Sequence, residues 1–273
     1  IDAPPVSIQG DARSIRSYTV TLEPHNLDWL FALEAPATLP ITNEFSTRLT
    51  AEMQIIASDL VRQRSRYDMR SYTTYRFNAD ASEAERRNWL QLPSTYNPRT
   101  LQLADEIRSR SGSDADRVRT TLEHLRRGGY EYTLTPPRLG RNSIDEFLFD
   151  TRQGYCEHYA SAFVFLMRAL DVPARVVTGY QGGELNPVDG FLTIRQSDAH
   201  AWSEVWLQGR GWVRVDPTAI VAPLRIDQGA SEIARRSGIA LPGASSFTWL
   251  RSIRFNWEAV QNSWNQWVLS YSQ

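Results

Sequence analysis

The 273-residue sequence contains no lysine, only one cysteine and no long apolar run. All thirty basic residues are arginines, so the chain cannot serve as its own lysine-amine substrate. A single cysteine excludes an internal disulfide and leaves the redox compartment open. No stretch approaches the roughly 20 apolar residues of a membrane span. Thirty-one acidic residues bring the net charge to −1, which argues against a nucleic-acid partner.

The length fits two compact domains, and the apolar patterns divide the chain into three parts. Alternating runs such as SYTVTLEP (17–24) and MRSYTTYRF (69–77) predict a small β-rich domain over residues 1–95. Helical spacing followed by further strand-like runs predicts a larger second domain over residues 96–240. Residues 241–273 form the third part.

The third part is predicted to be an amphipathic, tryptophan-rich helix. Its apolar residues recur at steps of three and four: Trp249, Ile253, Trp257, Val260, Trp264, Trp267 and Tyr271. Two interpretations remain open. The helix packs on the preceding domain, or it is a stalk at a membrane surface with Arg251 and Arg254 toward the headgroups.

The fold class follows from the second domain. From Cys156 to Leu170 the chain is apolar on nearly every side, which predicts a central buried helix that ends before Pro173. The strand-like runs that follow are ARVVTGY (174–180), FLTIRQ (191–196), AHAWSEVWL (199–207) and GWVRVDP (211–217). We therefore predict an α+β fold, in which the cysteine-bearing helix packs on an antiparallel sheet and the β-rich domain precedes this core.

Cys156, in RQGYCEHYASAF (152–163), has two interpretations. A lone cysteine is most often a small buried apolar residue. Cys156, however, stands at the predicted start of its helix, where the positive end of the helix dipole stabilises a thiolate. It also shares a helix face with Ala160 and Phe163, so the thiol points toward the sheet that packs there. This position favours a nucleophile.

A histidine and an aspartate on the last two strands could complete a catalytic arrangement. In a hairpin that turns near residues 208–210, position 200 pairs roughly with position 218, which puts His200 one pleat from Asp216. A base beside a thiol, held by a third group, is what nucleophilic catalysis needs. Each residue also has an ordinary interpretation, as a hydrogen-bonded strand histidine and as the turn residue before Pro217.

His158 is the rival base because it is close to the cysteine in sequence. Two residues along a helix it points about 200° away from Cys156, so we expect it to support the site or to face the substrate. One cysteine and scattered histidines lack the ligand spacing of a metal site. The acidic residues of QGGELNPVDG (181–190) are too sparse for a calcium loop. We therefore predict no metal and no cofactor.

Three blocks then carry a resemblance to a known family: GYCEHYASAFVFLMRALDVPARVVTGY, DAHAWSEVW and GWVRVDPT. In this order they resemble the transglutaminase-like superfamily of papain-type cysteine enzymes. The flanking regions are similar to the periplasmic portion of bacterial multi-pass membrane transglutaminases of the TgpA type. The resemblance implies a papain-like core with Cys156 as nucleophile, His200 as general base and acid, and Asp216 as its orienter. It also implies a membrane-anchored parent protein with this domain in the periplasm.

The resemblance further implies a substrate class. A glutamine-bearing protein or peptide is the acyl donor, a primary amine is the acceptor, and an envelope setting points to peptidoglycan peptides or an envelope protein. We expect Gln153, Tyr155, His158 and Trp202 near the substrate, and Gln153, Tyr155 or Trp202 as the second oxyanion donor. Trp202 and Trp206 have two open interpretations, as a shield that keeps water from the thioester or as ordinary core aromatic residues.

Two other function classes remain open. A cysteine protease or amidase uses the same three residues, because the second half-reaction depends only on whether water or an amine reaches the thioester. A catalytically idle binding module could keep the fold, although the intact cysteine, histidine and aspartate argue against this.

Overall fold

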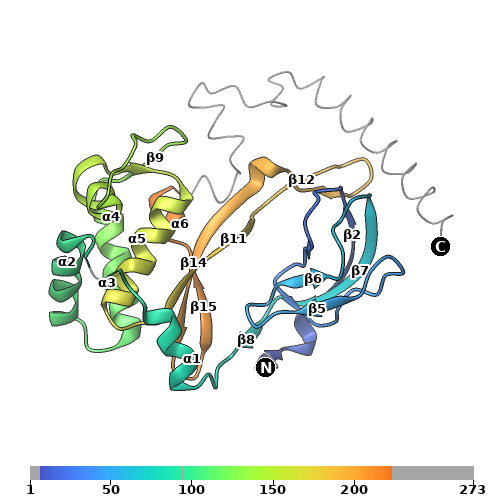
Figure 1. Cartoon of the computed structure of the whole chain (residues 1–273), viewed down its shortest axis with the longest axis horizontal. Helices are drawn as coiled ribbons and strands as arrows, with labels where there is room; N and C mark the ends of the chain where they lie inside the picture. The colour runs from blue at the N-terminus through green and yellow to red at the C-terminus, as the bar shows by residue number, and fades with distance from the viewer. Residues whose placement is uncertain (1–6, 94, 223–273) are drawn as a thin grey trace. The chain divides into compact units, whose positions relative to one another are not determined.

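The structure is a computed structural model that describes residues 7–93 and 95–222, and its contacts divide the chain into two compact units. Among the described residues, unit 1 contains residues 7–81 and the segment Gln208–Trp212, and unit 2 contains the described part of Ser82–Leu207 and residues 213–222 (Figure 1). The predicted helix at 241–273 lies outside the described residues.

The division falls at Ser82, whereas the sequence predicted a boundary after residue 95. The difference has a local cause. Helix α1 (Glu83–Arg87) and the 3-10 turn after it contact strands of unit 2 through arginine–tryptophan stacking. The Arg86 guanidinium lies 4.5 Å from the Trp206 ring centroid, and the Arg175 guanidinium lies 5.6 Å from that of Trp89. These two stacks attach the segment to unit 2.

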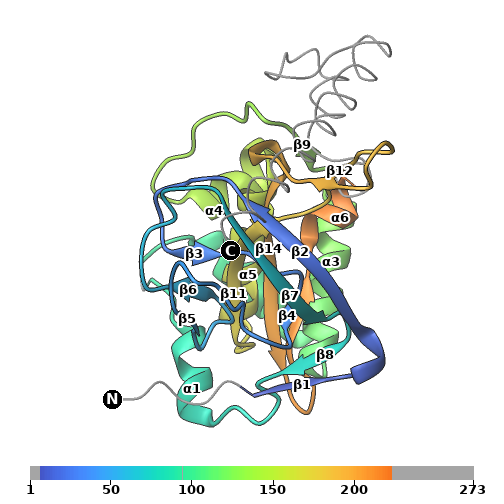
Figure 2. The ribbon, with the colours of Figure 1, turned by 90° about the vertical axis from the view of Figure 1, so that its right-hand side faces the viewer.

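Unit 1 is β-rich, as predicted. Its strands are β1 (Ile8–Gly10), β2 (Ile15–Leu22), β3 (Trp29–Leu30), β4 (Ala35–Pro36), β5 (Thr47–Leu49), β6 (Ile55–Ala57), β7 (Ser65–Tyr72) and β8 (Tyr75–Phe77). They form the sheets β2–β7–β4 and β3–β6–β5 and the antiparallel pair β1–β8. Figure 2 shows the long strands β2 and β7 side by side, with Ile15 opposite Tyr72 and Leu22 opposite Ser65.

The core of unit 1 follows from the strand period of two. In SRYDMRSY of β7, Tyr67 and Met69 are buried, whereas Asp68 between them and Arg70 after them are exposed. Tyr67 and Met69 join a cluster whose other buried members are Leu30, Ile55, Ala57 and Val61.

Unit 2 combines helices with strands. Its helices are α1, α2 (Pro98–Ser109), α3 (Asp114–Arg127), α4 (Ser143–Asp145), a π-helical turn (Glu146–Thr151), α5 (Cys156–Ala169) and α6 (Pro217–Val221). Its strands are β9 (Glu131–Tyr132), β10 (Gln153–Gly154), β11 (Ala174–Tyr180), β12 (Glu184–Leu185), β13 (Leu192–Thr193), β14 (Ala199–Leu207) and, from Val213 on, β15 (Gly211–Val215). Strand β14 lies between β11 and β15. The α+β class with a β-rich unit before the core is confirmed.

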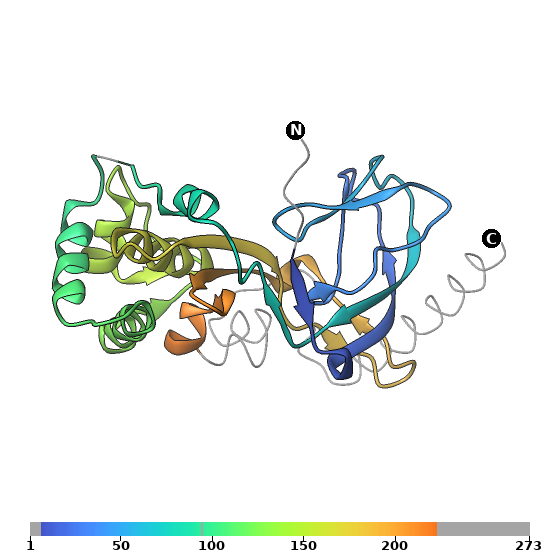
Figure 3. The same ribbon diagram turned by 90° about the horizontal axis from the view of Figure 1, so that it is seen from below.

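Helix α5 is the centre of unit 2. It packs on β14 and β11, and α2, α3 and α4 pack on it (Figures 1 and 3). Tyr159, Phe163, Leu166 and Met167 on this helix are fully buried, which confirms the prediction of a central apolar helix. Within the described residues, no helix combines the length and the apolar character needed to cross a membrane.

Candidate active site

Cys156 is the first residue of α5 and is 8% exposed. It packs against Ala160 on the same helix and Ala201 on β14, so the thiol side of the helix faces the sheet as the sequence predicted. The first N–H groups of a helix have no intrahelical partner, and they carry the positive end of the helix dipole. The position is therefore suited to a thiolate and to an oxyanion beside it.

The backbone before Cys156 approaches its neighbours closely. A side chain at Gly154 would place its Cβ 2.7 Å from Cβ of His158 and 2.9 Å from a ring carbon of Phe147. Strand β10 pairs in parallel with β9, which holds Gln153 opposite Glu131. The absence of a side chain at Gly154 thus lets the chain enter α5 directly over the core.

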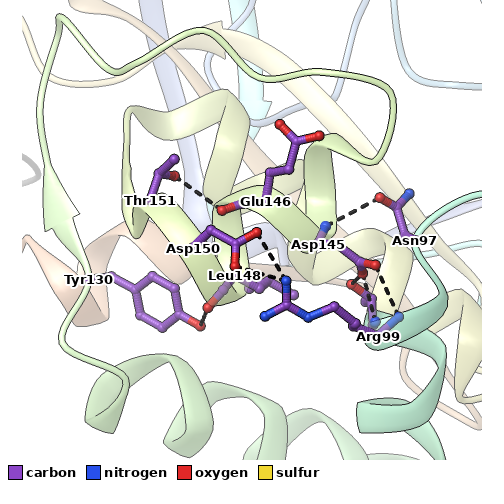
Figure 4. Close-up of polar contacts among 9 residues, drawn as sticks. Asn97, Arg99, Tyr130, Asp145, Glu146, Leu148, Asp150 and Thr151 are labelled. Carbon is purple, nitrogen blue, oxygen red and sulfur yellow. Dashed lines mark hydrogen bonds and ion pairs between the residues drawn. The ribbon is translucent and has the colours of Figure 1, made fainter.

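Further upstream of Cys156, the N-termini of α2 and α4 are joined by hydrogen bonds (Figure 4). Asp145 accepts hydrogen bonds from the backbone N–H groups of Arg99 and Thr100, at 3.0 and 2.8 Å, and from the Thr100 hydroxyl at 2.5 Å. In return, the Asn97 side-chain oxygen accepts from the N–H groups of Ile144 and Asp145. The beginnings of α2 and α4 therefore satisfy each other's free N–H groups.

We call the hydrogen bonds between the N-termini of α2 and α4 the clasp. The π-helical turn after α4 leads from the clasp to the segment before Cys156. Tyr130 donates its hydroxyl proton to the carbonyl oxygen of Leu148 at 3.0 Å, and the Thr151 hydroxyl donates to the carbonyl oxygen of Glu146 (Figure 4). Arg152 ends the turn in the left-handed region, with φ of 52°. The local backbone is therefore set by contacts on both sides of the turn.

His200 and Asp216 meet directly. His200 Nε2 and Asp216 Oδ2 are 2.7 Å apart, and the His200 side chain is fully buried. The sequence prediction that these side chains come together is confirmed, but Asp216 lies one residue beyond the end of β15 and not on the strand. His200 Nδ1 is also buried and has no nitrogen or oxygen hydrogen-bond partner among the described residues. This leaves Nδ1 as the ring nitrogen that can exchange a proton with a sulfur.

Asp216 uses its two oxygens for different tasks. While Oδ2 binds His200, Oδ1 accepts a hydrogen bond from the Thr218 N–H at 3.1 Å and so caps α6. Pro217 is the first residue of α6, where a missing N–H costs nothing. The ordinary interpretation of Asp216, as the turn residue before a proline, is therefore correct as well, and it fixes the carboxylate that faces His200.

The ionisation of His200 reflects this setting. Burial is the largest single influence on its pKa and lowers it, because a buried imidazolium loses its hydration. The hydrogen bonds to Asp216 and then to Cys156, with the charges of both, outweigh burial and raise the pKa above that of a free histidine. Cys156 therefore influences the pKa of the same ring that Asp216 holds.

His158 and Tyr155 shape the start of α5. His158 Nδ1 accepts a hydrogen bond from the Tyr155 N–H at 3.4 Å, and the two rings are in edge-on contact with centroids 4.6 Å apart. Burial lowers the pKa of His158 and raises that of Tyr155. His158 also contacts the ring of Phe147. Through these contacts His158 stabilises the N-terminus of α5.

The structure gives the other predicted site residues distinct surroundings. Gln153 Nε2 donates to Glu131 Oε2 at 3.0 Å, so its amide is already engaged. Trp202 stacks on His200, with ring centroids 6.3 Å apart and planes 25° apart. The sequence analysis missed Arg214, whose guanidinium lies 4.2 Å from the Trp202 ring centroid. No strand period predicts this contact, because it joins side chains of two different strands, β14 and β15.

The described residues, 7–93 and 95–222, contain no group of three or more His, Cys, Asp or Glu side chains placed to hold a metal ion. The loop 181–190 showed no calcium-binding pattern in the sequence. It contains β12 and is followed by β13, with Leu185 opposite Leu192.

Metal independence stays a prediction. We expect full activity after exhaustive chelation and dialysis. Loss of activity that added calcium restores would contradict it.

Comparisons with known proteins match most of the chain. Residues 101–217 match the family model of the Transglutaminase-like superfamily, and residues 2–78 match that of the TgpA N-terminal domain. The chain is 39% identical over 261 residues to a protein-glutamine gamma-glutamyltransferase of Pseudomonas aeruginosa. The alignment covers 93% of this chain and 38% of that protein, so the chain spans about two fifths of the relative's length.

A solved structure and a second relative extend the comparison. The periplasmic domain of TgpA from Pseudomonas aeruginosa superposes with a TM-score of 0.77 at 40% identity, over 82% of this chain and 76% of that domain. The uncharacterized protein YebA of Bacillus subtilis is 32% identical over 137 residues, which are 48% of this chain and 19% of that protein. The similarity to the TgpA domain therefore includes both units of the chain.

Proposed function

The chain belongs to the transglutaminase-like superfamily, as a periplasmic domain of the TgpA type, and from that premise we propose that it is a protein-glutamine gamma-glutamyltransferase. In this proposal Cys156 is the nucleophile, His200 is the general acid and base, and Asp216 orients His200. The substrates are a glutamine-bearing protein or peptide of the cell envelope and a primary amine.

One observation carries the proposal: His200 is held by Asp216 at 2.7 Å through Nε2 while its pKa responds to Cys156. A buried imidazole with one nitrogen fixed by a carboxylate presents the other nitrogen to the thiol in a defined tautomer. The thiol itself sits at a helix N-terminus, where a thiolate and a neighbouring oxyanion are both stabilised.

The first half-reaction transfers the acyl group to sulfur. The Cys156 thiolate attacks the carboxamide carbon of a glutamine side chain, and the oxyanion that forms accepts a hydrogen bond from the Cys156 backbone N–H. The C–N bond then breaks, and the imidazolium of His200 gives its Nδ1 proton to the leaving nitrogen, which departs as ammonia. Nε2 keeps its bond to Asp216 throughout.

The second half-reaction releases the thioester. A primary amine attacks the carbonyl carbon and gives a proton to neutral His200. The C–S bond breaks, an amide forms, and the thiolate–imidazolium pair is restored. Water in place of the amine would yield glutamate, which is the amidase outcome. The absence of lysine means that the enzyme offers no side-chain amine that would compete with the added acceptor.

The test is the incorporation of a labelled primary amine into a glutamine-bearing acceptor protein, with Cys156→Ala as the baseline. Because the chain has one cysteine, this variant removes every thiol from the protein. We expect label transfer by the wild-type chain and background transfer by the variant. Ammonia release that depends on Cys156 but occurs without label transfer would assign the protein to the amidases. Loss of both signals, also with peptidoglycan peptides as donors, would favour the binding module.

A further inference from the structure

Trp202 and His200 occupy one face of β14, because they are two residues apart on a strand. Their rings are stacked at 25°, with centroids 6.3 Å apart. Trp202 belongs to none of the proton-transfer steps described above, yet it covers a face of the ring that carries them.

Arg214 closes the stack from the other strand. Its guanidinium lies 4.2 Å from the Trp202 ring centroid, a distance typical of a cation–π contact. Arg214 Nη2 also donates to the Gln181 side-chain oxygen at 2.9 Å, and the Gln181 N–H donates to the carbonyl oxygen of Asp198 at 3.0 Å. Although Arg214 is exposed, its head group is therefore fixed by two contacts.

Strand β11 leaves room for the indole. Gly179 is opposite His200 in the register between β11 and β14. A Cβ at Gly179 would lie 2.9 Å from Cη2 and 3.3 Å from Cζ3 of Trp202. The Trp202 indole therefore occupies the space that a side chain at position 179 would need. This observation is independent of the Arg214 contact and also indicates that the position of the indole is fixed.

We propose that Trp202 is a positioning residue that holds the His200 ring in the plane in which Nε2 meets Asp216 and Nδ1 serves Cys156, with Arg214 and Gly179 fixing the indole. An imidazole bonded through one nitrogen can still tilt about that bond, and a flat aromatic neighbour on one face restricts the tilt. The charged groups that act on His200 are Asp216 and Cys156, whereas the Arg214 guanidinium contacts the Trp202 ring.

The proposal rests on the proposed function, but its first measurement needs no substrate. The rate at which iodoacetamide alkylates the single cysteine, measured from pH 4 to 10, reports the thiolate that His200 stabilises. We expect Trp202→Leu to move the pH of half-maximal alkylation upward by about one pH unit and to lower kcat/KM about 10- to 100-fold, since small misplacements of catalytic groups cost about this much. Trp202→Phe, which keeps an aromatic face, is expected to stay within about threefold of wild type.

Trp206→Leu is the matched control, because Trp206 is on the same face of β14 but contacts Arg86. It is expected to lower the melting temperature and leave the alkylation profile unchanged. Gly179→Ala is a second test variant, which displaces the indole without truncating it and should shift the profile in the same direction as Trp202→Leu. An unshifted profile in both Trp202→Leu and Gly179→Ala, or an equal shift in Trp206→Leu, would overturn the proposal. A wild-type chain that transfers no amine would instead overturn the proposed function and leave this result standing.

Discussion

Replacing Asp216 by Asn is expected to lower kcat/KM for amine transfer on the order of 10³- to 10⁴-fold with little loss of stability. Asn is as good an N-cap as Asp, so its side-chain oxygen can still accept from the Thr218 N–H and hold α6. The amide nitrogen then faces His200 Nε2, which can no longer keep its proton there. The imidazole adopts the other tautomer and loses the carboxylate that stabilises its charged form.

The pH dependence separates this effect from a change in fold. Asp216 contributes to raising the pKa of His200, while burial alone lowers it. The imidazolium that protonates the leaving nitrogen therefore persists to higher pH in the wild type than in Asp216→Asn. The limb of the rate profile that falls as pH rises should move to lower pH in the variant. Asp216→Ala is the comparison, since it should lose activity and also about 1 kcal/mol of stability through the missing cap. Wild-type activity in Asp216→Asn would remove Asp216 from the mechanism.

Much of the site could be predicted because its residues lie on regular elements. The runs at 174–180 and 199–207 coincide with β11 and β14, and a short turn between β14 and β15 fixes which residues meet. A hairpin with that turn predicts that His200 and Asp216 lie near each other. Cys156 was predictable because a helix start has a local pattern, here a glycine two residues earlier followed by an apolar helix.

The sequence did not predict the side-chain contacts that are independent of helix and strand periodicity. The stack of Arg214 on Trp202 requires both the twist between two strands and the empty position at Gly179 on a third. The domain boundary after residue 95 was predicted from the alternating strand-like runs, whereas α1 belongs to unit 2 through the stacking of Arg86 on Trp206. Side-chain pairs of this kind join residues far apart in the sequence, and only the assembled fold brings them together.

The clasp between α2 and α4 is another such contact, and it supports the second large prediction. Asp145→Ala is expected to lower the free energy of unfolding by about 3–5 kcal/mol, because it leaves the N–H groups of Arg99 and Thr100 and the buried Thr100 hydroxyl without their acceptor. Thr100 is fully buried, so water cannot replace the carboxylate. For a protein of this size we expect a fall in the melting temperature of roughly 8–15 °C, measured by calorimetry.

Asp150→Ala is the matched control, because both carboxylates bind Arg99 (Figure 4). Asp150 pairs with the Arg99 guanidinium at 2.8 Å, but its side chain is 51% exposed, and exposed pairs contribute about 0–1 kcal/mol. Two aspartates that share an arginine should therefore differ severalfold in their effect on stability, and burial of the bonded N–H groups is the reason. Equal losses in the two variants would mean that the clasp adds nothing beyond an ion pair. In that case the position of the segment that leads to Cys156 would depend on the π-helical turn and its contact with Tyr130 instead.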